Sequence, residues 1–363
     1  MKKHKKQKSG ERKSKSQSRR IKSMRAADAA MRLYNLPDAI SAIIAALFGK
    51  LGFTSVPNAA DLILKFALMR MLVRIMTKLQ ESWLPTTQAY FVTLLMDAGS
   101  TSDRMPTPDI DVLISSAMKA LKRVGLHGII FVEVHPLMNH PRGGEGRTLL
   151  WHCHIIAWTN EPIDIGAATR TIELMPGFVC SLGAKPVMII PIDNAAEMKR
   201  VCEYVTKPLY SVKNLMPKAD TPGSVIMMDT EKGLRPELVL RVAEGMSQLH
   251  PFDLIRGVGE GQGVVTTLRK EVMAWHRARK TTGLVLPRTF DTWAFWLNFR
   301  KEFGSPNYDP FRFDVAALRG PIRRQRKPRV ASTNSRVGRT GLRPRSPELR
   351  AAIRRAQKRR DSE

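Results

Sequence analysis

The sequence predicts an α+β protein in which helices cover a largely antiparallel sheet. Between residues 90 and 207, short apolar segments with strand-like patterning alternate with amphipathic segments of helical spacing. Residues 26–318 carry only about +4 of the formal net charge of +28, so the body of the chain is close to neutral. A near-neutral body of this length can bury a sizeable hydrophobic core.

The expected elements follow a definite order. Strands are predicted at 90–96, 128–134, 148–158 and 186–192, and helices at 109–124 and 165–174. Asn194, with Glu197 three residues later, forms a capping-box pattern, which predicts a further helix that ends at Pro208. The order strand, helix, strand, strand, helix, strand, helix is typical of a ferredoxin-like sheet.

The rest of the chain flanks this core. We expect a disordered basic arm at 1–25, a helical region at 26–85, the core at 86–215, a mixed and mostly helical region at 216–318, and a disordered basic tail at 319–363. The glycine-rich segment 257–263 is predicted to be a loop or hinge. No lysine follows it and no Walker motif occurs, which argues against a helicase or ATPase domain.

The two chain ends hold most of the positive charge. Residues 1–25 contain twelve Lys and Arg against one Glu, and residues 319–363 contain sixteen against three acidic residues. Arms of this kind neutralise phosphates without reading sequence. We therefore favour nucleic acid as the partner over a role in solubility or localisation alone.

Cysteine usage and hydropathy restrict the compartment. Three scattered cysteines form no disulfide framework, which favours a reducing, cytoplasmic location. The basic N-terminus has no adjoining apolar run of the kind found in signal peptides. The longest apolar stretch, 59–79, is interrupted by five charged residues, so we expect no membrane span.

Two histidines provide the first chemical motif. His152 and His154 share one face of the predicted strand at 148–158, whereas Cys153 points to the other face. If the preceding strand pairs with the same face shared, Glu133 or His135 joins them. Two imidazoles and a carboxylate suit Mn²⁺ or Mg²⁺, and zinc also fits. The alternative is a satisfied, partly buried histidine pair.

A tyrosine provides the second motif. Arg200, Tyr204 and Lys207 form a polar stripe on the helix predicted after Asn194, and this spacing places cations one turn before and after the tyrosine. Nearby positive charge favours the phenolate and stabilises charge at phosphorus, so Tyr204 is a candidate nucleophile. The alternative is an ordinary packing residue. Tyr210 remains open as a second nucleophile.

Three motifs in order resemble those of the HUH endonucleases, and within them the single-tyrosine rolling-circle replication initiators of plasmids, phages or viruses. FVTLLM at 91–96 resembles the first motif strand, WHCHII at 151–156 the His-hydrophobic-His motif, and YVTK at 204–207 the YxxK motif. GIIFVEVHP at 128–136 resembles the acidic strand that precedes the histidines. The tyrosine follows the histidines, which favours initiators over conjugative relaxases.

The resemblance covers about residues 88–215 and implies a DNA strand transferase. In this reading, a divalent ion on His152 and His154, with Glu133, polarises a phosphate of single-stranded origin DNA. Tyr204 attacks and becomes a 5′-phosphotyrosine, Lys207 assists, and Arg200 contacts DNA. The free 3′-hydroxyl then primes replication, and a host helicase is the expected partner.

Two other functions stay open from the sequence. A rolling-circle-type transposase would share the same core. A non-catalytic basic nucleic-acid-binding protein would make the motifs coincidental, and its activities would survive Tyr204→Phe and His154→Ala.

Overall fold

The structure is a computed structural model. It describes residues 22, 24–29, 31–32, 36–102, 106–137, 148–207, 211–217, 225–233 and 236–303, all of which belong to one compact unit. The predicted tail at 319–363, nearly all of the arm at 1–25, and Tyr210 lie outside the described residues.

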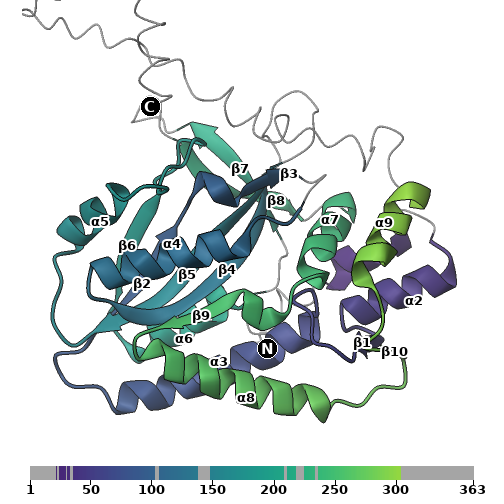
Figure 1. Ribbon diagram of the computed structural model, residues 1–363, viewed down its shortest axis with the longest axis horizontal. Helices are drawn as coiled ribbons and strands as arrows, with labels where there is room; N and C mark the ends of the chain where they lie inside the picture. Colours follow the sequence, from purple (N-terminus) through teal and green to yellow (C-terminus); the bar gives the residue numbers. More distant parts are fainter. Residues whose placement is uncertain are drawn as a thin grey trace, which may run out of the picture. The chain divides into compact units, whose positions relative to one another are not determined.

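Four antiparallel strands form the centre of the sheet and confirm the predicted α+β class. They are β2 (Gln88–Leu94), β4 (His127–Leu137), β5 (Thr148–Thr159) and β6 (Val187–Ile192), in the spatial order β6-β2-β5-β4. Helix α4 (Ile110–Arg123) lies between β2 and β4 in the chain, and α5 (Ile165–Glu173) lies between β5 and β6 (Figure 1). This order is the ferredoxin-like arrangement expected from the sequence.

Further strands extend this sheet. β7 (Ser211–Pro217) and β8 (Val225–Gly233) continue it beyond β4, β9 (Ile255–Val258) pairs antiparallel with β4, and β3 (Ser100–Ser102), which follows the short helix η1 (Asp97–Gly99), pairs with β5. β7 and β4 pair in parallel at one position, Leu137 with Lys213. The sheet is therefore antiparallel apart from this single contact within the described residues.

Side-chain caps start the helices where the sequence indicated. Asp109 accepts a hydrogen bond from the Val112 amide at the start of α4. Asn194 accepts one from the Glu197 amide at 2.9 Å and begins α6 (Ala195–Val205). Such caps satisfy amides that have no partner inside the helix. The predicted helix starts at 109 and 194 are thus confirmed.

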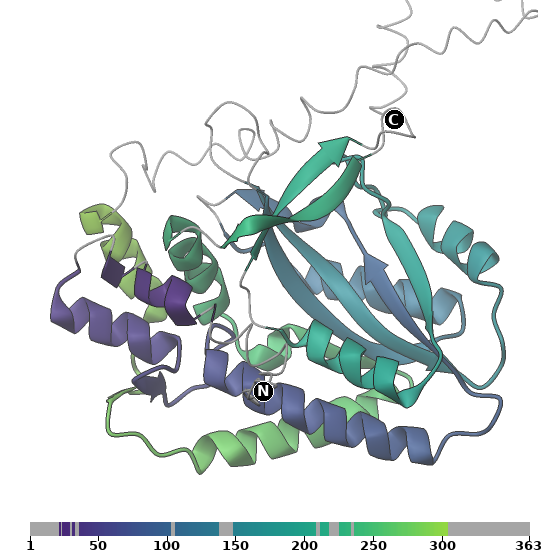
Figure 2. The same cartoon turned by 180° about the vertical axis from the view of Figure 1, so that it is seen from behind.

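Helices cover both faces of the central sheet (Figures 1 and 2). α4 and α5 pack on one face, over a core that includes Val132, Trp151 and Cys153. Helices α3 (Leu62–Glu81), α6 and α8 (Gly261–Arg277) pack on the other face, over Phe131 and Ile156. The candidate site residues lie on this second face.

A third cluster of buried side chains joins the chain regions on either side of the predicted core. It draws on α2 (Asp38–Leu47), α7 (Pro236–Ser247) and α9 (Thr292–Phe303). Nearby, β1 (Gly52–Thr54) pairs in parallel with β10 (Leu284–Leu286), and the short helix η2 (Pro251–Asp253) precedes β9. None of the helices in the described part of the chain is both long enough and apolar enough to cross a bilayer.

The structure differs from the sequence expectation at two places. A strand, β1, interrupts the region 26–85 that was expected to be helical. Its pairing partner lies 232 residues later, so no local sequence pattern indicates the strand. The predicted loop at 257–263 instead ends β9 and begins α8. Its glycines permit close backbone approach, since a Cβ on Gly261 would lie 1.9 Å from the Gly128 carbonyl oxygen.

Candidate metal centre

The register of two strands brings Glu133, His152 and His154 together. β4 and β5 pair so that Glu133 lies opposite His152 and Phe131 lies opposite His154. Because alternate residues of a strand share a face, all three polar side chains point to the same side of the sheet. The expected pairing of these two strands is confirmed, and all three residues are buried.

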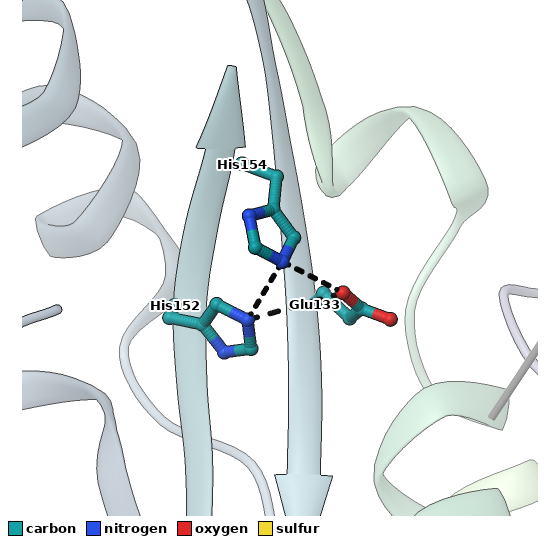
Figure 3. Close-up of side chains that lie close together, drawn as sticks. All are labelled: Glu133, His152 and His154. Atoms are coloured by element: carbon teal, nitrogen blue, oxygen red, sulfur yellow. Dashed lines mark hydrogen bonds and ion pairs between the residues drawn. The ribbon is translucent and has the colours of Figure 1, made fainter. Parts of the chain in front are cut away.

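Three ligand-type atoms converge at this point (Figure 3). The Nε2 atom of His154 lies 3.0 Å from Glu133 Oε2 and 3.0 Å from the Nε2 atom of His152. His152 Nε2 lies 3.9 Å from the same carboxylate oxygen. One atom from each residue lies within 4.8 Å of the others, a separation that a single divalent ion can bridge.

The outer nitrogens of both histidines have partners that orient the rings. Nδ1 of His152 lies 3.1 Å from the Leu150 carbonyl oxygen, which only accepts, so this nitrogen carries the proton. Nδ1 of His154 lies 3.0 Å from the Thr93 hydroxyl, which can either donate or accept. Both rings can therefore direct an Nε2 lone pair inward, the arrangement that metal-bound histidines use.

Two further groups contact the Glu133 carboxylate. The Lys207 ammonium lies 2.7 Å from it, and Nε2 of His135 lies 3.7 Å from its Oε1 atom. The His135 ring stacks on that of His152, with 4.8 Å between centroids. Of the two third ligands left open by the sequence, Glu133 is the one that converges with the histidine nitrogens, while His135 lies against its carboxylate.

Electrostatics hold these groups in the protonation states that a metal needs. Burial tends to raise the pKa of Glu133, but Lys207 and then His135 and His154 outweigh it and hold that pKa well below its usual value. Burial, followed by the neighbouring His154, lowers the pKa of His152 to about 3. Burial also lowers the pKa of His154. At neutral pH the site therefore offers a carboxylate and two neutral imidazoles.

Tyr204 lies directly against this group. It is on α6, and its ring centroid lies 5.1 Å from that of His154 and 5.6 Å from that of Phe91. The Lys207 ammonium sits 3.4 Å from the centroid of the Tyr204 ring. Lys207 was expected on the helix but lies just beyond it, because α6 ends at Val205. This position lets its side chain contact both Tyr204 and Glu133.

The structure separates other sequence candidates from the centre. The Arg200 side chain is 76% exposed and pairs with Glu197 at 3.3 Å, so it lies on the outer surface of α6. Cys153 faces the apolar core, as expected, and burial raises the pKa of its thiol to about 12. Tyr210 lies outside the described residues.

Sequence reasoning missed two residues of the site. Thr93, which orients His154, lies opposite it in the β2–β5 register. The motif segment at 91–96 contained this residue, but only the strand pairing reveals its role. Lys65 of α3 lines a cavity together with Glu133 and Lys207. No local pattern connects it to the histidines, because α3 precedes β4 by more than forty residues.

The donor set fits a divalent ion. Two imidazole nitrogens and one carboxylate oxygen leave coordination positions for water or substrate oxygens. The residues that would hold such an ion are Glu133, His152 and His154. Comparison of the chain with family models, with curated proteins and with solved structures finds no match.

Proposed function

We propose that this protein is a DNA strand transferase that cuts single-stranded DNA through Tyr204. The observation that carries the proposal is the contact between a tyrosine ring and a ligand-type histidine, 5.1 Å apart between centroids. A packing tyrosine needs no neighbouring group of two imidazoles and a carboxylate. A nucleophile that attacks a phosphate does benefit from one.

The metal proposed for Glu133, His152 and His154 is Mn²⁺ or Mg²⁺. When bound, such an ion acts as a Lewis acid on a phosphate oxygen and helps to orient the phosphate. The protein supplies rigid ligands, because His152 and His154 are oriented by Leu150 and Thr93. Rigid ligands favour a site that is already arranged for its substrate.

The proposed reaction is a transesterification. The Tyr204 phenolic oxygen forms a bond to phosphorus while the bond from phosphorus to the 3′-oxygen breaks. The phenolic proton is lost and the departing oxygen gains one, which gives a 5′-phosphotyrosine and a free 3′-hydroxyl. Lys207, 3.4 Å from the centre of the tyrosine ring, favours the phenolate and stabilises charge on the phosphate.

The biological role follows from the motif resemblance. The order of the histidine and tyrosine motifs supports a rolling-circle replication initiator, with origin DNA as substrate and a host helicase as partner. The phosphotyrosine link keeps the energy of the broken bond, so the same site can rejoin ends without ATP. The concentration of cationic residues at 1–25 and 319–363 supports a nucleic-acid substrate.

A covalent-trapping assay tests this proposal. Full-length protein, a labelled single-stranded DNA pool and Mn²⁺ are mixed and separated on a denaturing gel. We expect a DNA–protein adduct that disappears with a chelator and with Tyr204→Phe, a change that keeps the ring contacts. Tyr90→Phe is the matched control, because Tyr90 is 2% exposed and packs in the core on the opposite face of the sheet.

Two outcomes would contradict the proposal. An adduct that persists in Tyr204→Phe would move the nucleophile to another residue, with Tyr210 the first to test. DNA binding without any adduct, across a broad pool of sequences, would favour a non-catalytic nucleic-acid-binding protein.

A further inference from the structure

A cavity of about 50 Å³ lies beside the metal centre, on the α3 side of the sheet. Its polar lining comes from Asn58, Lys65, Glu133, Thr206 and Lys207, and the rest of its wall is apolar. Asn58 and Thr206 already hydrogen-bond, to Thr54 and to the Cys202 carbonyl oxygen respectively. Lys207 forms an ion pair with Glu133 at 2.7 Å. The remaining charged side chain in the lining is that of Lys65.

Lys65 is a partly buried lysine without a carboxylate in direct contact. Among the described residues, no carboxylate oxygen comes within ion-pair distance of its ammonium. Burial lowers the pKa of Lys65 to about 8, attraction by Glu133 opposes this, and repulsion by Lys207 adds to it. Two cations and a single carboxylate thus line one cavity. An anion that enters the cavity would relieve their repulsion.

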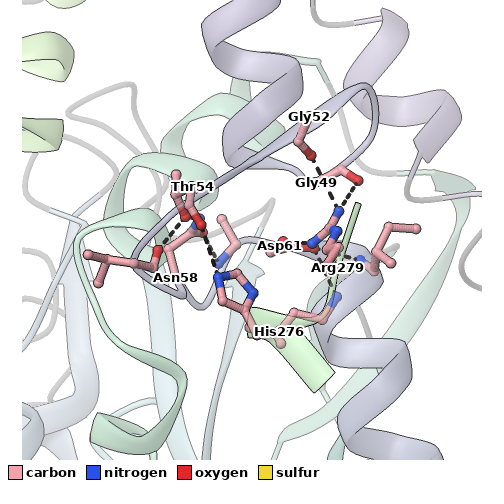
Figure 4. Close-up of polar contacts among 11 residues, drawn as sticks. Gly49, Gly52, Thr54, Asn58, Asp61, His276 and Arg279 are labelled. Atoms are coloured by element: carbon pink, nitrogen blue, oxygen red, sulfur yellow. Dashed lines mark hydrogen bonds and ion pairs between the residues drawn. The ribbon is translucent and has the colours of Figure 1, made fainter. Parts of the chain in front are cut away.

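The helix that carries Lys65 is held firmly at its start. Asp61 caps α3 by accepting hydrogen bonds from the Ile63 and Leu64 amides, at 2.9 Å each. The other carboxylate oxygen of Asp61 pairs with Arg279, next to the C-terminal end of α8 (Figure 4). Lys65 lies one turn after this cap, so its side chain leaves a fixed point of the backbone.

Arg279 and its neighbour His276 tie the same point to the preceding loop. Arg279 donates to the carbonyl oxygens of Gly49, at 2.7 Å, and Gly52, at 3.3 Å. Nε2 of His276 lies 3.0 Å from the Thr54 carbonyl oxygen (Figure 4). Segments on both sides of the core region therefore fix the start of α3. Such anchoring is typical of an element that presents a side chain to a site.

We infer that Lys65 is a substrate-contacting residue whose ammonium binds a phosphate of single-stranded DNA next to the one that Tyr204 attacks. The inference rests on the proposed function, which identifies single-stranded DNA as the molecule that enters the site. The lysine supplies three donors and one charge, which suits a phosphate oxygen. The helical region before the core thereby becomes part of the active site.

Salt-dependent DNA binding tests this role separately from the chemistry. The full chain carrying Tyr204→Phe, loaded with Mn²⁺, is titrated with a labelled single-stranded oligonucleotide of mixed sequence at several salt concentrations. Each lost phosphate contact reduces the slope of log affinity against log salt by about 0.7 for a single strand. We expect Lys65→Met to show this reduction, with affinity at low salt about tenfold weaker.

The controls separate a DNA contact from a structural role. Lys78→Met removes an exposed lysine from the last turn of the same helix and should leave the slope unchanged. Lys65→Arg keeps the charge and should restore most of the slope. The manganese affinity of Lys65→Met should match the parent, because the metal ligands stay intact. Its melting temperature should not fall, because burial and repulsion by Lys207 both disfavour the charge that is removed.

The outcomes are distinguishable. A slope that Lys65→Met leaves unchanged, or changes no more than Lys78→Met does, would overturn the inference, as would the absence of DNA binding by the parent protein. Wild-type protein that binds DNA in a Lys65-dependent manner but forms no adduct would remove the proposed chemistry and leave the phosphate contact supported.

Discussion

Strands β4 and β5 present two faces that are equally buried and chemically different. On the face covered by α4, Val132, Trp151 and Cys153 pack in an apolar core. On the opposite face, Glu133, His152 and His154 alternate with them and are 8%, 1% and 3% exposed. Burial of an apolar side chain is favourable, whereas burial of a carboxylate without partners is unfavourable.

The difference between the two faces shows where the sheet buries polar side chains in place of an apolar core. Buried polar groups need partners, and here Lys207 contacts the carboxylate while Thr93 and the Leu150 carbonyl oxygen contact the outer nitrogens of the two imidazoles. The two Nε2 atoms and a carboxylate oxygen converge closely enough for the group to be able to hold a metal ion. One face of the strand pair therefore packs an apolar core, and the other brings together three residues that could hold a metal ion.

The largest expected effect comes from the removal of one proposed metal ligand. His154→Ala should lower Mn²⁺ affinity by more than the roughly 100-fold upper limit seen for partners that only orient a ligand. Isothermal titration calorimetry of metal-free protein measures this affinity. Cys153→Ala, one residue away on the apolar face, is the matched control and should bind Mn²⁺ normally. Equal affinities for the two variants would contradict the distinction between the faces.

The apolar face should show the reverse pattern. Trp151 is fully buried, and its indole N–H donates to the Pro106 carbonyl oxygen at 2.7 Å. Trp151→Ala should lower the free energy of unfolding by about 3–5 kcal/mol, because it leaves a cavity. Urea unfolding measures the loss, and Mn²⁺ affinity of the folded fraction should not change. Loss of metal binding without loss of stability would show that the two faces are not independent.

A smaller effect is expected from the residue that orients His154. Thr93→Val keeps the size of the side chain but removes the hydroxyl that contacts Nδ1. Mn²⁺ affinity should fall by about 10- to 100-fold, less than for His154→Ala. Calorimetry under the same conditions ranks the two variants. A loss as large as that of His154→Ala would indicate that the substitution disturbs the strand itself.

The smallest expected effect is a pH dependence of the metal-free protein. The pKa of His152 is about 3 when folded and near 6.5 when unfolded, so the unfolded chain binds a proton first as the pH falls. The stability from this group is present above pH 6.5 and is lost below it, by about 2 kcal/mol at pH 5. Urea unfolding at pH 7.5 and pH 5 measures it, and His152→Asn should reduce the difference. Equal stability of wild type at both pH values would contradict this account.

Local patterns made part of this structure predictable. His152 and His154 lie on one strand, and Glu133 lies on the strand that precedes it, so alternation and antiparallel pairing suffice to bring them together. Helix caps are equally local, as Asn194 shows. Tyr204 and Lys207 are near enough in sequence for their proximity to be expected.

Long-range packing determined what the sequence did not reveal. Lys65 lines the same cavity as Glu133 only because α3 packs across the sheet, and Asp61, which caps α3, pairs with Arg279, 218 residues later. The pairing of β1 with β10 is similarly remote. Lys207 was predicted to lie on the helix, but α6 ends at Val205. Lys207 therefore follows the helix, and its ammonium contacts Glu133.

Mass spectrometry of a trapped DNA adduct tests the central claim most directly. Wild-type protein is incubated with single-stranded DNA and Mn²⁺, then digested with nuclease and trypsin. Residues 201–213 form one tryptic peptide that contains both Tyr204 and Tyr210, so fragmentation must assign the modified residue. We predict a nucleotide linked through phosphate to Tyr204, formed only with the metal. A nucleotide on any other residue, or an unmodified peptide from protein that binds DNA, would contradict the account.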